Sequence, residues 1–587
     1  MKWLLAMIAL LVLAGVAVSQ SKAKSKNPMA EDIRTYMSRI EGFGFSGALL
    51  VAKDGKVLVE SELGLADRVR KIPVKVDTLF DVGSVTKQFT AAAIMALESD
   101  GKLSVDNHIS KYFANTPEDK RSITIHHLLT HSAGLEMDFG DGDYEKVSRD
   151  EIVRRAMQSP LRSGPGERYA YSNAGYSLLA AIVEIVSAKK FDTFLRERLF
   201  APAGMTSTGY SFPKDQVHKF ARGYRDGEDW GVGAEKSSAT GGEFWNLIGN
   251  GGVHSTVGDM NRWMAALEAG KVLPKESVEK LFSPHVQVTA NYRRSNTPLH
   301  YGYGWNVWKQ PNGKTLIFHL GGNGVFNAAA RYHRDDRTVV VYLSNVSEFH
   351  DPSYPVPAIE RIVAGEIVEM PPKVVPLSAS RIAGYSGRYR ETGGGFLEVE
   401  AKTSFLKIEG EGQAALSFVA TGKWENDEKL CVFNERMAKV VEDSRTNRFD
   451  LVLSEYESGS TLTEVAELET LFWKKRYDRH GEYKDTRVLG TLPSRLRAYA
   501  ATSLVAIDFK RGTTYREYFW TPDGKIGDLG PIVAPPVARF FPLSQNCFAR
   551  FDPAEAVIVS NVCFEAGGIF DVIQKADRIR LKKHARS

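Results

Sequence analysis

The spacing of apolar positions changes several times along the chain, and each change predicts a helix or a strand. Apolar residues three and four apart predict a first helix over Glu31–Ile40. Two apolar runs then predict strands over Phe45–Ala52 and Lys56–Leu63, joined at Asp54-Gly55, a dipeptide typical of tight hairpins. An Ala-rich apolar run over Ser84–Ser99 predicts a buried helix.

The middle of the chain is mainly helical, and strand-like runs return later. Helices are predicted over Asn173–Ser187 and Val257–Ala269, and a last one over Val356–Val368. The strands expected between them are Gly304–Trp308, Thr315–His319, Ala328–Tyr332 and Thr338–Ser344. If early and late strands share one sheet, residues 31–368 form an α+β domain. It would hold an antiparallel sheet flanked by helices, plus a helical subdomain.

The pattern changes after a Pro-rich stretch, residues 369–378, which we interpret as a linker. Short alternating runs dominate residues 379–587, and helical periodicity is nearly absent. Examples are Phe396–Ala401, Ser404–Ile408 and Phe449–Leu453. We expect an all-β accessory region with one barrel, or two joined near residues 480–495.

The first residues have the pattern of an export signal. A positive charge at Lys2, the apolar run Trp3–Val18 and small residues ending at Ser19 predict a signal peptide over residues 1–19. The alternative is an uncleaved anchor. The Lys- and Ser-rich residues 20–30 then form a flexible leader. No later stretch reaches the ~20 apolar residues of a membrane helix, so we expect a periplasmic or secreted protein with no membrane span after cleavage.

Composition and charge narrow the range of partners. Hydrophobic residues are 43% and charged residues 25% of the 587 positions, as in ordinary folded proteins. The 76 basic and 71 acidic residues nearly balance, so no nucleic-acid partner is expected. The chain has three cysteines, Cys431, Cys547 and Cys563, and their spacing forms no Cys-x-x-Cys motif. Cys547 and Cys563 could pair across a hairpin if the protein is exported, which would leave one cysteine free.

We expect neither a metal nor a cofactor. His127 and His131 share a helix spacing, but Leu128 stands where a zinc helix of this type carries glutamate. Both histidines are therefore expected to be structural. The acidic run Asp138–Asp143 does not have the spacing of a calcium loop and is interpreted as a surface loop. Three tryptophans that could line a pocket are expected to pack in the core: Trp230, Trp245 and Trp305.

The stretch Ser84-Val85-Thr86-Lys87 opens the apolar helix and is the first candidate for chemistry. The positive end of a helix favours negative charge developing on Ser84. A spacing of three places Lys87 on the same face, and burial there would lower its pKa from ~10.4. The alternative is a capping serine with a solvated lysine. Other Ser-x-x-Lys copies lack this context: Ser21/Lys24, Ser187/Lys190, Ser211/Lys214 and Ser404/Lys407.

Two further motifs complete the candidate site. Tyr171-Ser172-Asn173 precedes an apolar helix; a phenol beside an ammonium can ionise and take the serine proton, and Asn173 could donate to a substrate amide oxygen. His319-Leu320-Gly321-Gly322 follows a strand, and a free N–H here could form an oxyanion hole with that of Ser84. The alternatives are a core tyrosine with a helix-capping asparagine, and a simple glycine hairpin.

In this order, Ser-Val-Thr-Lys, Tyr-Ser-Asn and His-Leu-Gly-Gly resemble the motifs of class C β-lactamases, D,D-peptidases and their esterase and aminopeptidase relatives. The resemblance covers about residues 30–365. Flanking stretches are similar too: Asp100–Asp106, Ile125–Leu135 and Asn250–Thr256. The resemblance implies a β-lactamase/transpeptidase-like fold and an acyl-enzyme on Ser84. Lys87 and Tyr171 would move its proton, Asn173 would contact substrate, and the N–H groups of Ser84 and Gly322 would hold the oxyanion.

His319 departs from the family pattern, since β-lactamases and penicillin-binding proteins usually carry lysine there. Such a lysine fixes a substrate carboxylate, whereas histidine is charged only conditionally. We therefore expect an exported serine hydrolase acting on an ester, peptide or amide bond, with His319 and Asn173 binding substrate. Its partner would be a small molecule or peptide, with cell-wall fragments among the candidates. The alternative is a penicillin-recognising or peptidoglycan-binding sensor with little turnover. The oligomeric state is not predicted.

Overall fold

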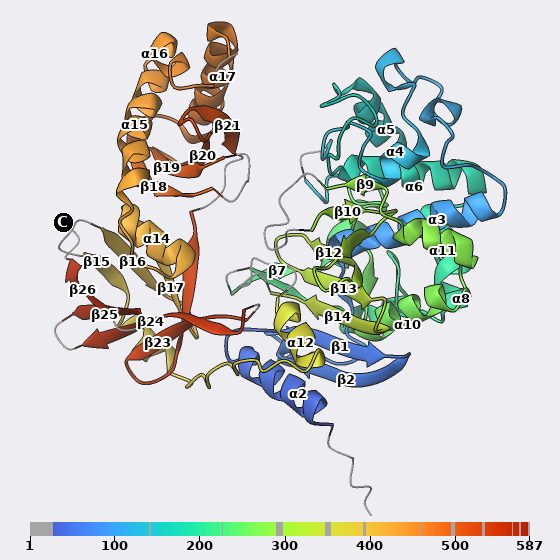
Figure 1. The fold of residues 1–587 in the computed structure, drawn as a ribbon, viewed down its shortest axis with the longest axis horizontal. Coiled ribbons are helices and arrows are strands. Elements are labelled where there is room, and N and C mark those ends of the chain that lie inside the picture. Colours follow the sequence, from blue (N-terminus) through green and yellow to red (C-terminus); the bar gives the residue numbers. More distant parts are fainter. Residues whose placement is uncertain are drawn as a thin grey trace, which may run out of the picture.

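The computed structural model describes residues 27–584 except residues 140–141, 226, 289–296, 347–353, 391–394, 458–459, 495–498, 531–534, 554, 566–567 and 575–576. The predicted signal peptide and most of the predicted leader lie outside the described residues. Figure 1 shows a first domain, which includes β1 to β14, beside an arm made of the C-terminal elements. No described helix combines the length and the apolar character needed to cross a membrane.

An antiparallel sheet forms the centre of the first domain, in the order β2-β1-β14-β13-β12-β11-β10-β9. Its strands are β1 (Gly47–Lys53), β2 (Lys56–Leu63), β9 (Val286–Gln287), β10 (Leu299–Tyr301), β11 (Asn306–Lys309), β12 (Thr315–Gly322), β13 (Asn327–His333) and β14 (Thr338–Ser344). Gly47 pairs with Ser344, so the early and late strands share one sheet, as predicted.

Helices cover both faces of this sheet because β1 is apolar on both sides. Leu49 and Val51 pack with α2 (Pro28–Glu41) and α12 (Val356–Val363). Ala48 and Leu50 lie in a larger core on the other face. That core holds α3 (Lys87–Ser99), α6 (Asn173–Ser187), α10 (Val257–Glu268) and α11 (Lys275–Phe282). The predicted class, an antiparallel sheet flanked by helices plus a helical region, is confirmed.

Short elements connect these layers in the helical region. They include β5 (Phe80–Asp81), η1 (Gly83–Thr86), α4 (Ile125–Leu129), α5 (Arg149–Gln158), α7 (Phe191–Leu195), β6 (Gly223–Arg225), β7 (Glu228–Gly231), α9 (Gly233–Ala239) and β8 (His254–Ser255). The predicted helix over Ser84–Ser99 is divided, because residues 83–86 form a tighter 3-10 turn before α3 begins at Lys87. Ser84 therefore lies in the turn η1, one turn before the α-helix.

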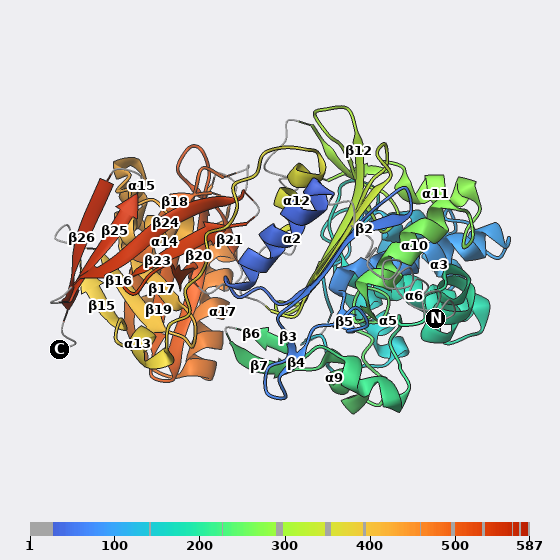
Figure 2. The same cartoon turned by 90° about the horizontal axis from the view of Figure 1, so that it is seen from below.

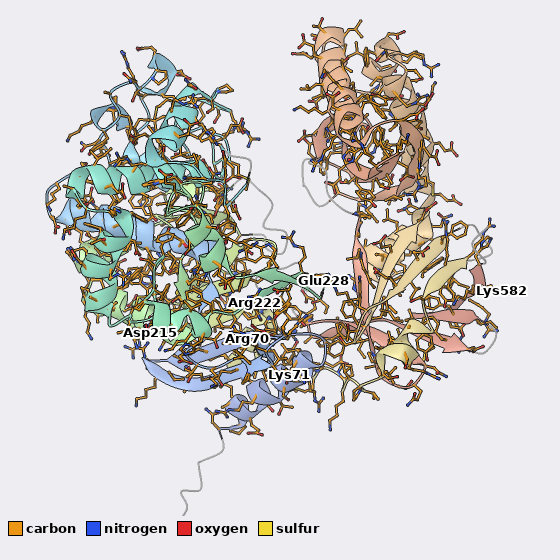
Figure 3. All side chains as sticks on the ribbon, turned by 180° about the vertical axis from the view of Figure 1, so that it is seen from behind. Arg70, Lys71, Asp215, Arg222, Glu228 and Lys582 are labelled. Atoms are coloured by element: carbon orange, nitrogen blue, oxygen red, sulfur yellow. A yellow bond between two sulfur atoms is a disulfide. The ribbon has the colours of Figure 1, made fainter. Side chains whose placement is uncertain are left out.

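Among its described residues, the accessory region contains one closed eight-stranded barrel, in agreement with the first of the two predicted arrangements, a single barrel. Its strands are β15 (Gly387–Arg390), β16 (Phe396–Ala401), β17 (Leu406–Glu411), β22 (Val537–Pro542), β23 (Cys547–Asp552), β24 (Val557–Glu565), β25 (Ile569–Gln574) and β26 (Asp577–His584). Figure 3 shows Lys582 of β26 at the end of the barrel away from the first domain.

The rest of this region is not all-β, and that part of the prediction is wrong. Between β17 and β22 the chain forms α14 (Gln413–Thr421), α15 (Glu428–Arg445), α16 (Phe449–Leu453), α17 (Leu462–His480) and a sheet of β18 (Tyr483–Pro493), β19 (Ala501–Phe509), β20 (Gly512–Trp520) and β21 (Ile526–Gly530). The residues 449–453 were predicted to form a strand but form a helix. The prediction failed because a five-residue apolar run is too short to show whether its period is that of a strand or of a helix. A capping box of Thr461 and Glu464 marks the start of α17 and was the missed signal.

The barrel packs against the α2 side of the sheet. The ring of Phe43 lies 5.2 Å from that of Phe541 and 5.4 Å from that of Phe551. The Tyr36 hydroxyl donates to the Pro553 carbonyl at 2.7 Å. Figure 2 shows α2 and α12 between the barrel and the sheet. These contacts leave the opposite face of the sheet, where α3 lies, to the first domain's own helices.

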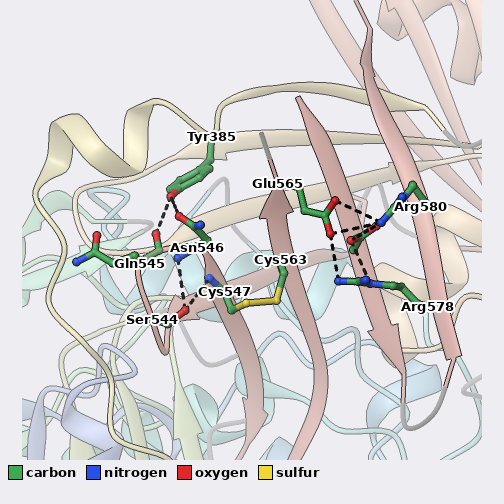
Figure 4. Close-up of a disulfide and its surroundings, with 10 residues drawn as sticks. Tyr385, Ser544, Gln545, Asn546, Cys547, Cys563, Glu565, Arg578 and Arg580 are labelled. Carbon is green, nitrogen blue, oxygen red and sulfur yellow. Dashed lines mark hydrogen bonds and ion pairs between the residues drawn. A yellow bond between two sulfur atoms is a disulfide. The ribbon is translucent and has the colours of Figure 1, made fainter. Parts of the chain in front are cut away.

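Cys547 and Cys563 face each other on β23 and β24 and form a disulfide (Figure 4). Cys431 is a free cysteine. For Cys547 and Cys563 the expected pairing is thus present. Their sequence separation is 16, so the bond closes a short loop. We expect the double variant Cys547→Ser/Cys563→Ser to lose about 3 kcal/mol of unfolding free energy, because the unfolded chain gains the entropy of an open loop. Urea titration followed by circular dichroism measures this loss. Equal midpoints for variant and wild type would contradict a stabilising role.

Candidate active site

Ser84 is held in place by the segments on either side of it. Asp81 ends β5, which pairs with β8, and the Val82 N–H donates to the Val253 carbonyl at 2.9 Å. Gly83 follows with a φ of +49°, which favours glycine because it has no side chain to clash. The chain then turns through η1, which places the Ser84 side chain next to that of Lys87, the first residue of α3.

Lys87 is fully buried, and its amine has three polar neighbours. Nζ lies 3.0 Å from Ser84 Oγ, 2.8 Å from Asn173 Oδ1 and 2.9 Å from the Asn250 carbonyl oxygen. Burial lowers the pKa of Lys87 well below its usual value, and the negative charges of Asp138 and Asp143 oppose this only in part. A larger fraction of Lys87 is therefore neutral at a given pH than would be the case for a solvated lysine.

These neighbours also orient a neutral amine. The oxygens of Asn173 and Asn250 can only accept hydrogen bonds, so the two N–H bonds of a neutral amine would point to them. Its lone pair would then face the Ser84 hydroxyl, which would donate to it. The Asn173 amide is fixed in this orientation because its Nδ2 donates to Asp138 Oδ1 at 2.9 Å. This geometry would allow a neutral Lys87 to accept the proton of Ser84.

Tyr171 lies on the other side of the Ser84 hydroxyl. Its phenol is hydrogen-bonded to the Ser84 side chain, and Lys87 Nζ lies 4.8 Å from its ring centre. Burial raises the pKa of Tyr171, which outweighs the opposite effect of the bond to Ser84. A neutral phenol both accepts and donates hydrogen bonds, so it can pass on its own proton as it receives another, and this position suits a relay better than a resting base.

His131, predicted to be structural, supports Tyr171 from behind. The ring is buried and lies 4.2 Å, centre to centre, from the ring of Tyr171. Its Nδ1 accepts from the Ser172 N–H at 3.1 Å, and the Ser172 hydroxyl in turn caps α6 by accepting from Gly175 N at 3.0 Å. The Tyr-Ser-Asn motif is therefore fixed on both sides of Tyr171.

Gly322 ends β12 beside the Ser84 turn. The Arg334 N–H donates to the Thr315 carbonyl at 3.1 Å, which makes these two residues a hydrogen-bonded pair of β12 and β13. Such pairs alternate along antiparallel strands, so the backbone groups of Gly321 bond to β13. The N–H of Gly322 then points to the opposite edge of β12. On that edge, β11 pairs with β12 only as far as Phe318. The turn η1 packs there instead.

The approach of η1 to this edge is close enough to require glycines. A Cβ at Gly83 would lie 2.6 Å from Gly322 N. A Cβ at Gly321 would lie 2.0 Å from the Val82 carbonyl oxygen and 3.1 Å from Ser84 N. The structure thus brings together the backbone nitrogens of Ser84 and Gly322, the two predicted for an oxyanion hole.

His319 lies close to this site, but its ring is turned inward. Nε2 lies 2.9 Å from the Tyr301 hydroxyl and Nδ1 lies 2.7 Å from the Leu320 carbonyl oxygen. Since a carbonyl only accepts, Nδ1 carries the proton and Nε2 accepts from Tyr301. Only 3% of the residue is exposed. A substrate contact, as predicted for His319, would require one of these bonds to break.

Burial and the nearby charge of Lys87 lower the pKa of His319 to about 3, so the ring is neutral at and above pH 5. We expect His319→Gln to keep the pH–rate profile of the wild type between pH 5 and 9, because no charge on residue 319 changes in that range. Steady-state kcat/KM measured across this range tests the expectation. An inflection near pH 6.5 that disappears in the variant would contradict it.

Sequence reasoning missed the contacts of three residues around the site: Asp81, Asn250 and Tyr301. Asn250 begins a stretch that resembles the family, but only folding shows that its carbonyl oxygen reaches Lys87, as it shows the contacts of Asp81 and Tyr301. Trp245 and Trp305 are buried in the core as expected, and Trp230 packs between Tyr144 and Phe326. Among the described residues, no group of three or more His, Cys, Asp or Glu side chains is arranged to hold a metal ion.

Comparison with known proteins gives one family match and several relatives. The family model described as Beta-lactamase matches residues 33–361. Penicillin-binding protein 4* of Bacillus subtilis is 28% identical over 394 residues, covering 63% of this chain and 85% of that protein. Esterase EstB of Burkholderia gladioli is 31% identical over 198 residues, covering 30% of this chain and 50% of that protein.

One solved structure extends the likeness into the accessory region. The octameric penicillin-binding protein homologue from Pyrococcus abyssi is similar with a TM-score of 0.52 and 19% sequence identity. The match covers 95% of this chain and all of the other. At this identity the likeness concerns the fold alone.

Proposed function

Because this chain belongs to the beta-lactamase family, we propose that it is a serine hydrolase that forms an acyl-enzyme on Ser84. The observation that carries the proposal is the set of contacts around Lys87. A buried amine with lowered pKa faces the Ser84 hydroxyl at 3.0 Å, while two carbonyl oxygens take its hydrogens. This arrangement activates a nucleophile and has little value for stability, because burying an amine is costly.

In the first step, Ser84 Oγ attacks the substrate carbonyl carbon while its proton passes to Lys87 Nζ. The carbonyl π bond opens, and the negative oxygen is held by the N–H groups of Ser84 and Gly322. When the tetrahedral intermediate collapses, the bond to the leaving group breaks. Tyr171 gives its phenol proton to the leaving group and regains one from Lys87.

In the second step, water attacks the acyl-enzyme and the same groups act in reverse. The amine and phenol take a proton from the water, and Ser84 leaves with a proton restored to its oxygen. The side-chain amide of Asn173 has one N–H bonded to Asp138 and a second that can donate to the substrate. We assign Asn173 to substrate binding on this basis.

The neutral, inward-facing His319 bears on the substrate class. The strand beside Ser84 lacks the fixed positive charge with which a lysine would hold a carboxylate. We infer that esters, peptides and amides are better substrates than β-lactams. The partial match to an esterase supports this inference. Export by the N-terminal signal, with a periplasmic or extracellular small molecule or peptide as substrate, is part of the same proposal.

A substrate panel tests the proposal. Purified protein is assayed with p-nitrophenyl esters, D- and L-amino acid p-nitroanilides and nitrocefin. We expect steady turnover of an ester or anilide and weak turnover of nitrocefin. A stoichiometric burst without turnover would favour the sensor alternative. No reaction with any acyl donor, together with no covalent labelling by a fluorophosphonate, would overturn the proposal.

A further inference from the structure

We propose that Asp81 is a positioning residue that fixes the two N–H groups of the oxyanion hole relative to each other, an inference that rests on the proposed function. The two groups belong to segments far apart in sequence: Ser84 in η1 and Gly322 at the end of β12. A hole of this kind works only if both donors are held before the reaction. The structure shows one buried carboxylate that joins the two segments.

One oxygen of Asp81 holds the Ser84 turn. Oδ1 accepts from the Gly83 N–H at 2.8 Å, one residue before the nucleophile. Asp81 is itself fixed from behind, because its backbone pairs with His254 on β8. Only 2% of the residue is exposed, so solvent cannot replace these contacts without a change in the fold.

The other oxygen holds the turn that follows Gly322. Oδ2 accepts from Asn323 Nδ2 at 3.1 Å. The other end of the same amide, Asn323 Oδ1, accepts from the Val325 N–H at 3.1 Å and the Phe326 N–H at 2.9 Å. Asn323 therefore folds the turn between β12 and β13 and ties it to Asp81. The Tyr144 hydroxyl bonds to Asp81 as well.

The electrostatic surroundings explain why a carboxylate is needed here. Three donors converge on Asp81, and the ionised form can accept from all of them without an O–H group that would itself need an acceptor. Burial raises the pKa of Asp81 to about 6, so the group is ionised at pH 8. No lysine or arginine is bonded to it in the described contacts; its neighbours are Gly83, Asn323 and Tyr144, with Asp143 acting on it at longer range.

Exchanging the two side chains separates this role from general stability. In Asp81→Asn the Gly83 N–H keeps an acceptor, but two amide nitrogens, both donors, then face each other at Asn323. Asn323→Asp places two carboxylates together. In the double variant Asp81→Asn/Asn323→Asp the bond re-forms with donor and acceptor reversed. We expect each single variant to lose about 10²-fold in kcat at pH 8, with a smaller change in KM, and the double variant to regain most of it.

Asp259→Asn is the matched control. Asp259 is as buried as Asp81, accepts from the Ser207 N–H at 2.7 Å and the Thr208 hydroxyl at 2.8 Å, and differs from Asp81 in being paired with Arg262; all three partners lie outside the site. Its loss is expected to lower the melting temperature and leave kcat unchanged. All variants are compared below their melting temperatures, with turnover of a p-nitrophenyl ester and with fluorophosphonate labelling.

The outcomes distinguish the two proposals. If the wild type shows no Ser84-dependent turnover, the proposed function fails. If the wild type is active and Asp81→Asn keeps full kcat, or the double variant loses the product of the two single losses, Asp81 is not a positioning residue. If Asp81→Asn fails to fold, Asn323→Ala provides the test, because Asn323 is only half-buried. This variant must lower kcat by a larger factor than it raises KM. An unchanged kcat overturns the inference.

Discussion

Ser84→Ala is expected to lower kcat by about 10³-fold or more on any ester or amide that the protein hydrolyses. The variant removes the proposed nucleophilic oxygen and leaves the rest of the site in place, so binding should persist while turnover stops. Steady-state kinetics give kcat and KM, and gel fluorescence after treatment with a fluorophosphonate reports the covalent step. Labelling should disappear together with turnover.

Ser404→Ala is the matched control, since Ser404 and Lys407 form a second Ser-x-x-Lys in the same chain. Ser404 is exposed and lies in the accessory region, just before β17. This variant should label and turn over like the wild type. If Ser84→Ala kept its labelling, or Ser404→Ala lost it, Ser84 would not be the nucleophile.

Lys87→Met should lower kcat nearly as much as Ser84→Ala, because it removes the proposed acceptor of the Ser84 proton. A positioned general base contributes about 10²- to 10⁴-fold, and we expect kcat to fall by that factor. Lys87→Arg should be no better, because a guanidinium keeps its proton at all working pH values and has no lone pair to offer. Stopped-flow acylation rates separate this effect from substrate binding.

The pH dependence of the acylation rate is an independent test of the role proposed for Lys87. Because burial lowers the pKa of Lys87, the base is present at lower pH than an ordinary lysine would allow, and the acylation rate should rise with pH through that lowered pKa. Lys120→Met is the control, as Lys120 is also buried but pairs with Asp119. A wild-type profile that rises only near the pKa of a free lysine would contradict the role given to Lys87.

The sequence was sufficient to predict the class of the first domain and its main strands and buried helices, because these elements carry strong local patterns. β1 and β14 are apolar along most of their length, and α3 carries an Ala-rich apolar run and is buried from Lys87 to Leu97, so the type of each element is indicated locally. The motifs at Ser84, Tyr171 and Gly322 stood out because each joins a turn to an apolar element. Folding then brings all three to one place.

The orientation of side chains within the site was not predictable in this way. The direction of the His319 ring depends on Tyr301, which reaches it from β10, an element with no distinctive pattern. Asp81 likewise looks like an ordinary residue before a turn until Asn323 is placed beside it. Such contacts depend on tertiary structure that spacing along the chain does not encode.

The accessory region shows a different limit. The helices α15 and α17 expose much of their surface, and Leu468 and Leu471 on α17 are themselves exposed. Their apolar residues therefore do not mark one clean face, and the amphipathic period is weak. The insertion between β17 and β22 further separates strands that close one barrel, so sequence order did not reveal the barrel's composition.

Mapping the covalent intermediate shows which residue carries the acyl group. The wild type is mixed with a p-nitrophenyl ester, quenched in acid during turnover, digested and analysed by mass spectrometry. We expect the acyl mass on the peptide containing Ser84 and no acyl mass on the Ser84→Ala protein under the same quench. An acyl group attached to a different residue during productive turnover would contradict this expectation.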